Sequence, residues 1–316
     1  MCTGVRFSDD KGHMFFGRNL DWSVPYGQKV VLTPRGYRYE SAFLGDISMK
    51  AGAAIGMAIV EEDTPLYFDC ANEKGLAIAG LNFPGYAKYE DSAIDGKANV
   101  AAYEFPLWVV ANFATVDEVE KALENVAIIA KPINDKYPVS MLHWLIGDAN
   151  RSIVVEYTDK GMEIFHNDVG ILTNQPGYAW HQENLRNYMN LFPQTPKEIE
   201  WGKAKMTAFG SGSLMRGIPG DYYSPSRFVR VAYLNTHYPT KSTEKENISR
   251  LFHTLAGVAM IDGAAAMADG AYEKTIYTGG YSTQTKIYYY NTYEDPAIQK
   301  VAMKDYDLDS NVLTQV

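Results

Sequence analysis

The second residue of the chain is a cysteine, and this position opens a chemical possibility. Removal of the initiator Met1 would leave Cys2 with a thiol and a free α-amine on one residue. An ordinary thiol has a pKa of about 8.5 and an ordinary α-amine one of about 7.7–8.0. Near neutral pH such an amine can take a thiol proton and return it to a leaving group, so one residue supplies nucleophile, base and acid. From its position alone, however, Cys2 is explained more simply as a small second residue.

A predicted β-hairpin changes that balance. Residues 3–7 and 14–19 have the composition of two strands, and the turn residues 9–12 (Asp-Asp-Lys-Gly) separate them. If the turn is centred between residues 10 and 11, paired positions have numbers that sum to about 21. The hairpin then places Cys2 across from residues 18–19, which are Arg and Asn.

Arg18 gives this predicted neighbourhood its charge. A nearby cation increases the thiolate fraction of a cysteine, and the thiolate is the nucleophilic form. Asp21 follows three residues later, on the opposite face of a regular strand. It joins the same site only if the strand ends or bulges before it. Taken alone, Arg18 and Asp21 fit an ordinary surface ion pair equally well.

The remaining pattern predicts an α+β fold in a single domain spanning residues 1–316. Strands are expected at 30–33, 53–60, 65–70, 76–83, 142–147, 152–157, 162–166, 275–277 and 286–292. Helices are expected at 104–113, 116–126, 178–191, 226–238 and 243–260, and Thr115 is the predicted N-terminal cap of the second. Because hairpins dominate and helices come in consecutive pairs, we expect helices packed on antiparallel sheets. Residues 192–226, rich in Gly, Pro and Ser, are expected to form a long surface region.

Composition excludes several classes of partner. The formal net charge of −9 argues against binding to nucleic acid or to an anionic membrane, because both need a basic surface. No run of about 18 apolar residues predicts a membrane-spanning helix. The six histidines show no metal-ligand spacing, so no metal site is expected. The N-terminal residues lack the features of a signal peptide, which predicts a cytoplasmic protein.

Several motifs distributed along the chain resemble those of the choloylglycine hydrolase family. This family contains conjugated bile salt hydrolases and penicillin V acylases and belongs to the N-terminal nucleophile hydrolases. The matching motifs are Met1-Cys2-Thr3, Phe16-Gly17-Arg18-Asn19-Leu20-Asp21, Asn72-Glu73-Lys74-Gly75-Leu76, Ala79-Gly80-Leu81-Asn82-Phe83-Pro84, Leu172-Thr173-Asn174-Gln175-Pro176, Gly217-Ile218-Pro219-Gly220-Asp221 and Ser224-Pro225-Ser226-Arg227-Phe228.

The resemblance implies a four-layer αββα sandwich with two antiparallel sheets, and hydrolysis of an unactivated amide without any metal or organic cofactor. It also implies a role for each matching position. Cys2 is the expected nucleophile, with its own α-amine as proton carrier. The other expected catalytic residues are Arg18 and Asp21, which hold and polarise Cys2, Asn82 and Asn174, which donate to the oxyanion, and Arg227, which completes the charged cluster.

Asn82 favours one branch of the family, because bile salt hydrolases resemble this chain in having Asn there, whereas penicillin V acylases tend to have Tyr. The expected substrate is therefore a bile acid joined by an amide to glycine or taurine. A steroid needs a broad apolar cleft, and Leu20, Trp22 and Phe83 are the predicted binding residues. The resemblance further implies a homo-oligomer, specifically a tetramer.

Two alternatives remain open at this point. One is another acylase of the same family, acting on penicillin V or on acyl-homoserine lactones. The other is a ligand-binding protein without enzymatic activity, whose 23 tyrosines form a stacking surface.

Overall fold

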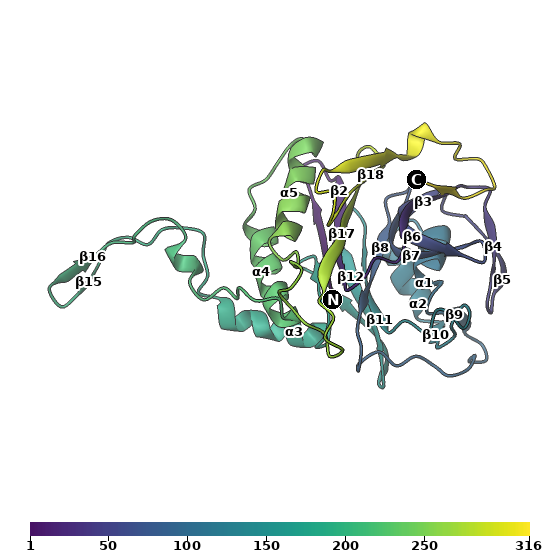
Figure 1. The fold of residues 1–316 in the computed structure, drawn as a ribbon, viewed down its shortest axis with the longest axis horizontal. Coiled ribbons are helices and arrows are strands. Elements are labelled where there is room, and N and C mark those ends of the chain that lie inside the picture. The colour runs from purple at the N-terminus through teal and green to yellow at the C-terminus, as the bar shows by residue number, and fades with distance from the viewer.

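Two antiparallel β-sheets pack face to face, and helices cover their outer faces. The computed structural model describes residues 1–316 (Figure 1). The six-stranded sheet contains, in spatial order, β14 (Ile171–Leu172), β1 (Cys2–Ser8), β2 (Met14–Trp22), β17 (Lys274–Ser282), β18 (Ile287–Thr292) and β19 (Gln299–Ala302). The eight-stranded sheet contains β13 (Gly161–His166), β12 (Ser152–Thr158), β11 (Leu142–Gly147), β8 (Ala77–Asn82), β7 (Thr64–Asn72), β6 (Ala54–Glu61), β3 (Lys29–Thr33) and β20 (Thr314–Gln315).

The helices complete a four-layer αββα arrangement, as the sequence predicts. Helices α4 (Ser224–His237) and α5 (Glu244–Ala256) pack on strands of the six-stranded sheet, and α1 (Phe105–Asn112) packs on β7 and β8 of the other sheet beside α2 (Val116–Leu123) (Figure 1). Helix α3 (Tyr178–Asn184) lies next to α4. Three further strand pairs are peripheral: β4 (Arg38–Ser41) with β5 (Gly45–Ser48), β9 (Ala98–Ala101) with β10 (Val126–Ile129), and β15 (Ile199–Trp201) with β16 (Ala204–Met206).

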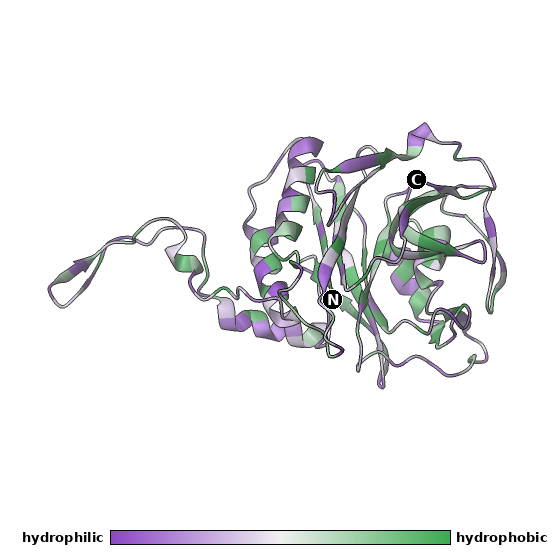
Figure 2. Ribbon diagram, in the orientation of Figure 1, coloured by the Kyte–Doolittle hydropathy of each residue, from purple (hydrophilic) through white to green (hydrophobic).

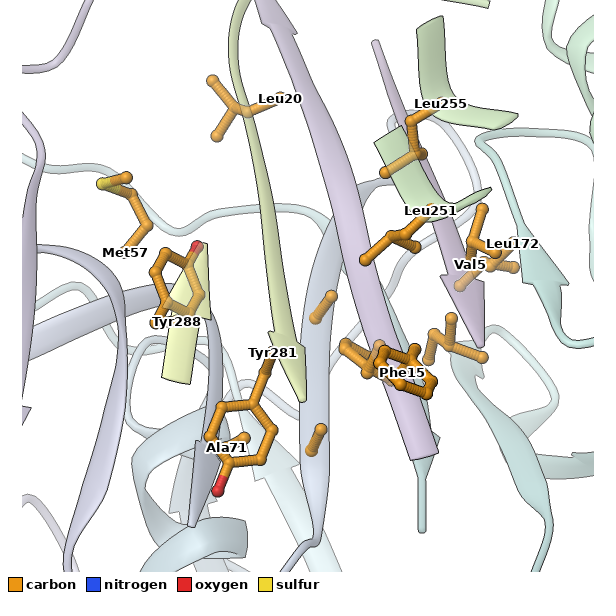
Figure 3. Close-up of a cluster of buried hydrophobic side chains, with 14 of the residues drawn as sticks. Val5, Phe15, Leu20, Met57, Ala71, Leu172, Leu251, Leu255, Tyr281 and Tyr288 are labelled. Atoms are coloured by element: carbon orange, nitrogen blue, oxygen red, sulfur yellow. The ribbon is translucent and has the colours of Figure 1, made fainter. Parts of the chain in front are cut away.

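Strand β2 lies between two regions of apolar packing because its side chains alternate between the faces of its sheet. On one face Phe15 lies near Leu251 of α5, and on the other Leu20 points toward the eight-stranded sheet, where Met57 lies (Figure 3). A second apolar cluster fills the space between the eight-stranded sheet and helices α1 and α2. Helices α2 and α5 carry apolar residues on their inner faces and polar residues outside, whereas α1 is apolar on all sides and buried apart from Asn112 (Figure 2). Strand β2 is therefore supported from both sides.

The N-terminal hairpin forms as predicted, but its register differs by one residue. Cys2 pairs with Leu20, and Gly4 pairs with Arg18. The reason is the length of the turn: Ser8 pairs with Met14, so five residues rather than four lie in the loop. Inside the loop the carboxylate of Asp9 accepts hydrogen bonds from two backbone N–H groups, which stabilises this longer turn. Arg18 lies two residues before Leu20, the partner of Cys2. The side chains of Arg18 and Cys2 therefore point to the same face of the sheet.

The other predicted elements are confirmed, although their boundaries shift in either direction. Helix 116–126 ends at Leu123, and helix 178–191 is α-helical only to Asn184 before one turn of 3₁₀-helix. The cap predicted at Thr115 forms, since its hydroxyl accepts the N–H of Glu118. The strand predicted at 275–277 is longer, and the short peripheral strands were not predicted.

The predicted surface region is an extended arm, defined here as residues 189–222. It projects away from the sandwich and ends in the β15–β16 hairpin (Figure 1). The N–H of Phe192 donates to the carbonyl of Leu214, so the two legs of the arm are joined near its base. Separately, none of the helices in the chain combines the length and the apolar character that crossing a membrane requires.

Gly17 provides a test of how closely β2 and β17 approach each other. A Cβ added at Gly17 would lie 2.4 Å from the carbonyl oxygen of Gly279 and 3.0 Å from Leu251 Cδ2. We expect Gly17→Ala to lower the free energy of unfolding by about 1–3 kcal/mol, because the backbone must shift to admit the methyl group. Urea denaturation of the variant measures this. Gly210→Ala is the control, since nothing lies within 4 Å of its added Cβ; equal stability of both variants would contradict the expectation.

Candidate active site

A cleft opens where the two sheets meet, and Cys2 lies on its wall. The cleft holds about 940 Å³ of unfilled space, counting the open solvent at its mouth. Polar groups at one end come from Cys2, Arg18, Asp21 and Asn82. The rest is largely apolar and is lined by, among others, Leu20, Trp22, Tyr26, Ile59, Leu66, Phe68, Ile133, Tyr137 and Leu142.

Two of the three predicted binding residues line this cleft. Leu20 and Trp22 are both on its wall, and the ring of Trp22 stacks near that of Tyr26 with centroids 6.4 Å apart. Phe83 does not line the cleft. It is fully buried and stacks on His143 with centroids 4.1 Å apart. Because neighbouring residues in an extended chain point in opposite directions, a cleft-lining Asn82 directs Phe83 away from the cleft.

Arg18 contacts the Cys2 thiol directly. Its Nη2 donates to Cys2 Sγ at 2.6 Å, and the guanidinium is 1% exposed. Its Nη1 donates to the carbonyl oxygens of Phe68, at 2.9 Å, and Gly80, at 2.6 Å, on strands β7 and β8 of the facing sheet. A guanidinium whose donors are fixed at several points is held in place beside the sulfur.

Asp69 supplies negative charge behind Arg18. The carboxylate accepts hydrogen bonds from the hydroxyls of Tyr277 and Tyr288, which lie on β17 and β18 of the other sheet. Burial raises the pKa of the Asp69 carboxyl, and Arg18 and the two hydroxyls oppose that shift. For Arg18 the neighbouring groups outweigh burial. Burial alone would lower the pKa of the guanidinium, but Cys2, Tyr277 and Asp69 raise it above its ordinary value. Arg18 and Asp69 are thus two buried groups, each of which forms hydrogen bonds with the opposite sheet.

Asn174 and Arg227 contact the backbone of Cys2. Asn174 Oδ1 accepts the N–H of Cys2 at 2.8 Å and a hydrogen bond from Arg227 Nη2 at 2.6 Å. Arg227 Nη1 also donates to the carbonyl oxygen of Cys2 and to the hydroxyl of Thr3 at 2.7 Å. The side chain amide of Asn174 donates to the carbonyl oxygen of Asn82 at 2.7 Å. The first strand is therefore held at its start by two fully buried polar side chains.

Asp21 lies beside the N-terminus, on the far side of Cys2. The structure carries Met1, whose ammonium donates to the backbone carbonyl of Asp21 at 2.7 Å and to Glu273 Oε1 at 3.0 Å. One carboxylate oxygen of Asp21 accepts from the hydroxyl of Thr275 at 2.6 Å, and the other is buried without a partner. Burial raises the pKa of the Asp21 carboxyl, although the Met1 ammonium and Arg227 oppose this.

The bulge that Asp21 was expected to need lies in the neighbouring strand. Strand β2 continues regularly to Trp22, and the register shifts in β17 between Thr275 and Tyr277. The extra residue in β17 sets Thr275 opposite Asp21 while Tyr277 lies opposite Leu20. The bulge thus gives the Asp21 carboxylate the Thr275 hydroxyl as its hydrogen-bond partner, while β2 itself stays regular, contrary to the expectation.

The structure brings all six predicted catalytic residues together around Cys2, and it adds residues that sequence reasoning missed. Cys2, Arg18, Asp21 and Asn82 line the cleft, whereas Asn174 and Arg227 contact the backbone of Cys2 from the interior. The additional residues are Asp69, Glu273, Ser224 and the buried pair His143 and His181. Ser224 and His181 contact the backbone of Asn174, and His143 contacts the carbonyl oxygen of Thr173 beside it. Glu273 binds the ammonium of Met1, and Asp69 accepts from Tyr277 and Tyr288 near Arg18. Only Ser224 carried a signal, because it lies within a motif that was recognised. Its hydroxyl accepts the N–H of Asn174 at 3.0 Å.

Comparison with known proteins agrees with this arrangement. The family model of the linear amide C–N hydrolases, choloylglycine hydrolase family, matches residues 2–315. The chain belongs to the choloylglycine hydrolase family. It is 56% identical to a bile salt hydrolase/transferase of Bifidobacterium longum subsp. longum, over 100% of this chain and 99% of that protein. It is 45% identical to a conjugated bile acid hydrolase of Lactobacillus acidophilus, over 99% of each chain.

A solved structure of the same family has the same fold. A mutant of the conjugated bile acid hydrolase from Clostridium perfringens superposes with a TM-score of 0.93 at 37% identity, covering 100% of this chain and 96% of that one. Family membership confirms the resemblance seen in the sequence motifs. It also confirms an enzyme rather than a binding protein that only presents tyrosines.

The buried His181 makes stability depend on pH. Burial, with smaller contributions from the neighbouring His143 and Arg227, lowers the pKa of His181 to about 4. In the unfolded chain His181 binds a proton near pH 6.5, whereas in the folded chain it stays neutral down to about pH 4. Its contribution to the free energy of unfolding is therefore complete above pH 6.5 and is lost as the pH falls to 4. We expect the loss to be about 3 kcal/mol for this residue.

Urea denaturation between pH 7 and pH 4 measures the effect. The difference in unfolding free energy between the two pH values should be smaller in His181→Gln than in the unmodified protein. His166→Gln is the matched control, because His166 is on the surface. If His181→Gln and His166→Gln lost stability equally toward pH 4, the buried imidazole would not be the cause.

Proposed function

We propose that the protein hydrolyses the amide bond of glycine- or taurine-conjugated bile salts, releasing the free bile acid and the amino acid. The observation that carries this is the placement of Cys2 Sγ, which receives a hydrogen bond from Arg18 at the polar end of an apolar cleft. The relatives named as bile salt or conjugated bile acid hydrolases, which match this chain along almost its whole length, support the substrate class.

The proposed reaction begins once Met1 is removed, because only then is the nitrogen of Cys2 an amine. In the unprocessed chain this nitrogen donates to Asn174 Oδ1 at 2.8 Å, and the same oxygen would orient the free amine. The amine takes the thiol proton, and the sulfur attacks the carbonyl carbon of the substrate. The tetrahedral intermediate then collapses, the amine returns the proton to the leaving nitrogen, and a thioester remains. Water, activated by the same amine, cleaves the thioester.

Two amide side chains near the sulfur are proposed to stabilise the oxyanion. Asn82 lines the cleft and is only partly buried, so its side chain faces the position of a substrate carbonyl. Asn174 donates to the Asn82 carbonyl oxygen, which links the two residues in one fixed unit. Losing one such donor typically costs about 10²–10³ in rate. Arg227 and Asp21 are proposed to fix the backbone and the amine of Cys2 on either side.

The apolar part of the cleft fits a steroid. Leu20 and Trp22 follow Arg18 on the same strand, so the substrate can lie along apolar side chains while its amide reaches the sulfur. Tyr26 and Phe68 extend this wall, with ring centroids 5.3 Å apart. Burying apolar surface contributes roughly 25 cal/mol per Å², so a steroid can supply most of the binding energy without many polar contacts.

Incubation with glycocholate and taurocholate tests the proposal through the amount of glycine or taurine released. The processed enzyme should release at least one of them, and Cys2→Ala should release neither, because no other nucleophile replaces the thiol. Intact mass of the active enzyme should lack one methionine. Penicillin V in the same assay covers the acylase alternative. Release from neither conjugate, or faster turnover of penicillin V than of both, would contradict the proposed substrate.

We also propose that the arm mediates self-association into the homotetramer expected from the sequence. Large apolar side chains of the arm are exposed to solvent, which is unfavourable unless another surface covers them. These side chains are Met189, Phe192, Ile199, Trp201 and Phe209. The arm has few partners within its own sandwich, so a second copy is the proposed cover. The cytoplasmic location and the single-domain organisation likewise stay predictions.

Light scattering coupled to size-exclusion chromatography measures this association. The unmodified protein is expected to elute as a tetramer, and the double substitution Trp201→Ser with Phe209→Ser is expected to shift it to smaller species, because the interface loses its apolar anchors. A matched pair at exposed tyrosines outside the arm, Tyr272→Ser with Tyr293→Ser, should leave the tetramer intact. A tetramer that persists in the arm variant would contradict the role of the arm.

A further inference from the structure

Two buried histidines contact the backbone carbonyl groups of the two peptide units that flank the Cα atom of Asn174. His143 Nε2 lies 2.9 Å from the carbonyl oxygen of Thr173, and His181 Nε2 lies 3.0 Å from the carbonyl oxygen of Asn174. Both side chains are completely buried. A carbonyl oxygen only accepts hydrogen bonds, so each Nε2 must carry a proton and donate it.

Neither carbonyl oxygen accepts a hydrogen bond from a backbone N–H group. Residues 173–177 lie between the end of β14 and the start of α3, where neither a sheet nor a helix supplies donors. Buried backbone carbonyls without a partner cost free energy, so a donor is needed at each position. The histidines supply these donors from two separate elements, β11 and α3.

The imidazole rings are fixed by their own neighbours. His143 stacks on Phe83 at an interplanar angle of 9°, and His181 stacks on Phe228 at 11° with centroids 4.4 Å apart. Phe83 directly follows Asn82, and Phe228 directly follows Arg227. Each histidine therefore connects the Asn174 segment to the residue next to another member of the site.

His143 is further held by a buried carboxylate. Glu156 Oε1 lies 3.0 Å from His143 Nδ1 and accepts the N–H of Tyr178 at 2.9 Å. Because Nε2 already carries a proton, a second proton must lie between Nδ1 and the carboxylate for this contact to be favourable. The orientation of His143 is thus set at both nitrogens. His181 Nδ1, by contrast, is buried without a partner.

We propose that His143 and His181 are positioning residues, which hold Asn174 by its peptide carbonyls so that its side chain amide meets Cys2 and Asn82 in the catalytic geometry. This rests on the catalytic role of Asn174 in the proposed function. Neither histidine touches the reacting atoms. They act because a displacement of about 1 Å in a catalytic group can cost about 10²-fold in rate.

Substitutions of His181 test the proposal through three measurements: kcat, KM for a conjugated bile salt, and the rate at which iodoacetamide alkylates Cys2. His181→Leu removes the donor, and we expect kcat to fall by about tenfold or more with KM within about twofold. Alkylation forms no oxyanion, so its rate should stay within about twofold. The other thiol, Cys70, does not interfere, because burial raises its pKa well above the ordinary value.

His181→Gln is the conservative variant, since its amide nitrogen can take the place of Nε2 and restore most of kcat. His181→Asn is shorter and should restore less. Leu and Gln substitutions at His143 repeat the comparison at the second carbonyl. The proposal is overturned if kcat of the Leu variants stays within twofold, or if alkylation falls in parallel with kcat. If the Leu variants do not fold, equal kcat for Gln and Asn at position 181 overturns it.

A double-mutant cycle separates this proposal from the one on which it rests. If His181 acts only through Asn174, His181→Leu should cause no further loss of kcat in an Asn174→Ala background. Multiplicative losses would overturn the positioning role while leaving Asn174 catalytic. Full activity of Asn174→Ala alone would instead refute the role assigned to Asn174 in the proposed function.

Discussion

The site depends on one side chain that crosses between the two sheets. Arg18 starts on β2 and donates to the Cys2 sulfur and to two carbonyl oxygens of the facing sheet. A buried guanidinium is costly unless its donors are satisfied and its charge is balanced. Asp69 contributes to that balance, so the stability of the interior and the placement of the Cys2 sulfur rest on the same guanidinium. The sandwich can therefore be packed closely only if Arg18 and Cys2 are also placed correctly.

Much of the fold was predictable where the information is local. Alternation, turn residues and the Thr115 cap predicted the hairpins and most helices, because these depend on neighbours in the chain. The predicted register of the first hairpin was wrong by one residue. Hydrogen bonds to the Asp9 carboxylate favour a longer loop than the turn sequence indicated. Short peripheral strands such as β4 carry too few alternating residues to be recognised.

The site was predictable to the extent that motifs marked it. Resemblance to the family supplied Asn174 and Arg227, which spacing alone would have assigned to a turn and to a surface position. Asp69 and the histidines were missed for a physical reason. They reach the site through strand pairing and packing between segments far apart in the sequence, and a lone buried His or Asp has no local signature. Phe83 shows the reverse error, because alternation beside Asn82 already directed its ring into the interior.

The position of Met1 has a consequence for how the protein is made. Its ammonium is held in a corner formed by the Asp21 carbonyl and Glu273, and its side chain is only about one third exposed. A chain that folds before it is cut therefore conceals the very bond that must be cleaved. Removal of Met1 is therefore easiest before the N-terminal strand pairs with its neighbours, while the Met1–Cys2 bond is still accessible.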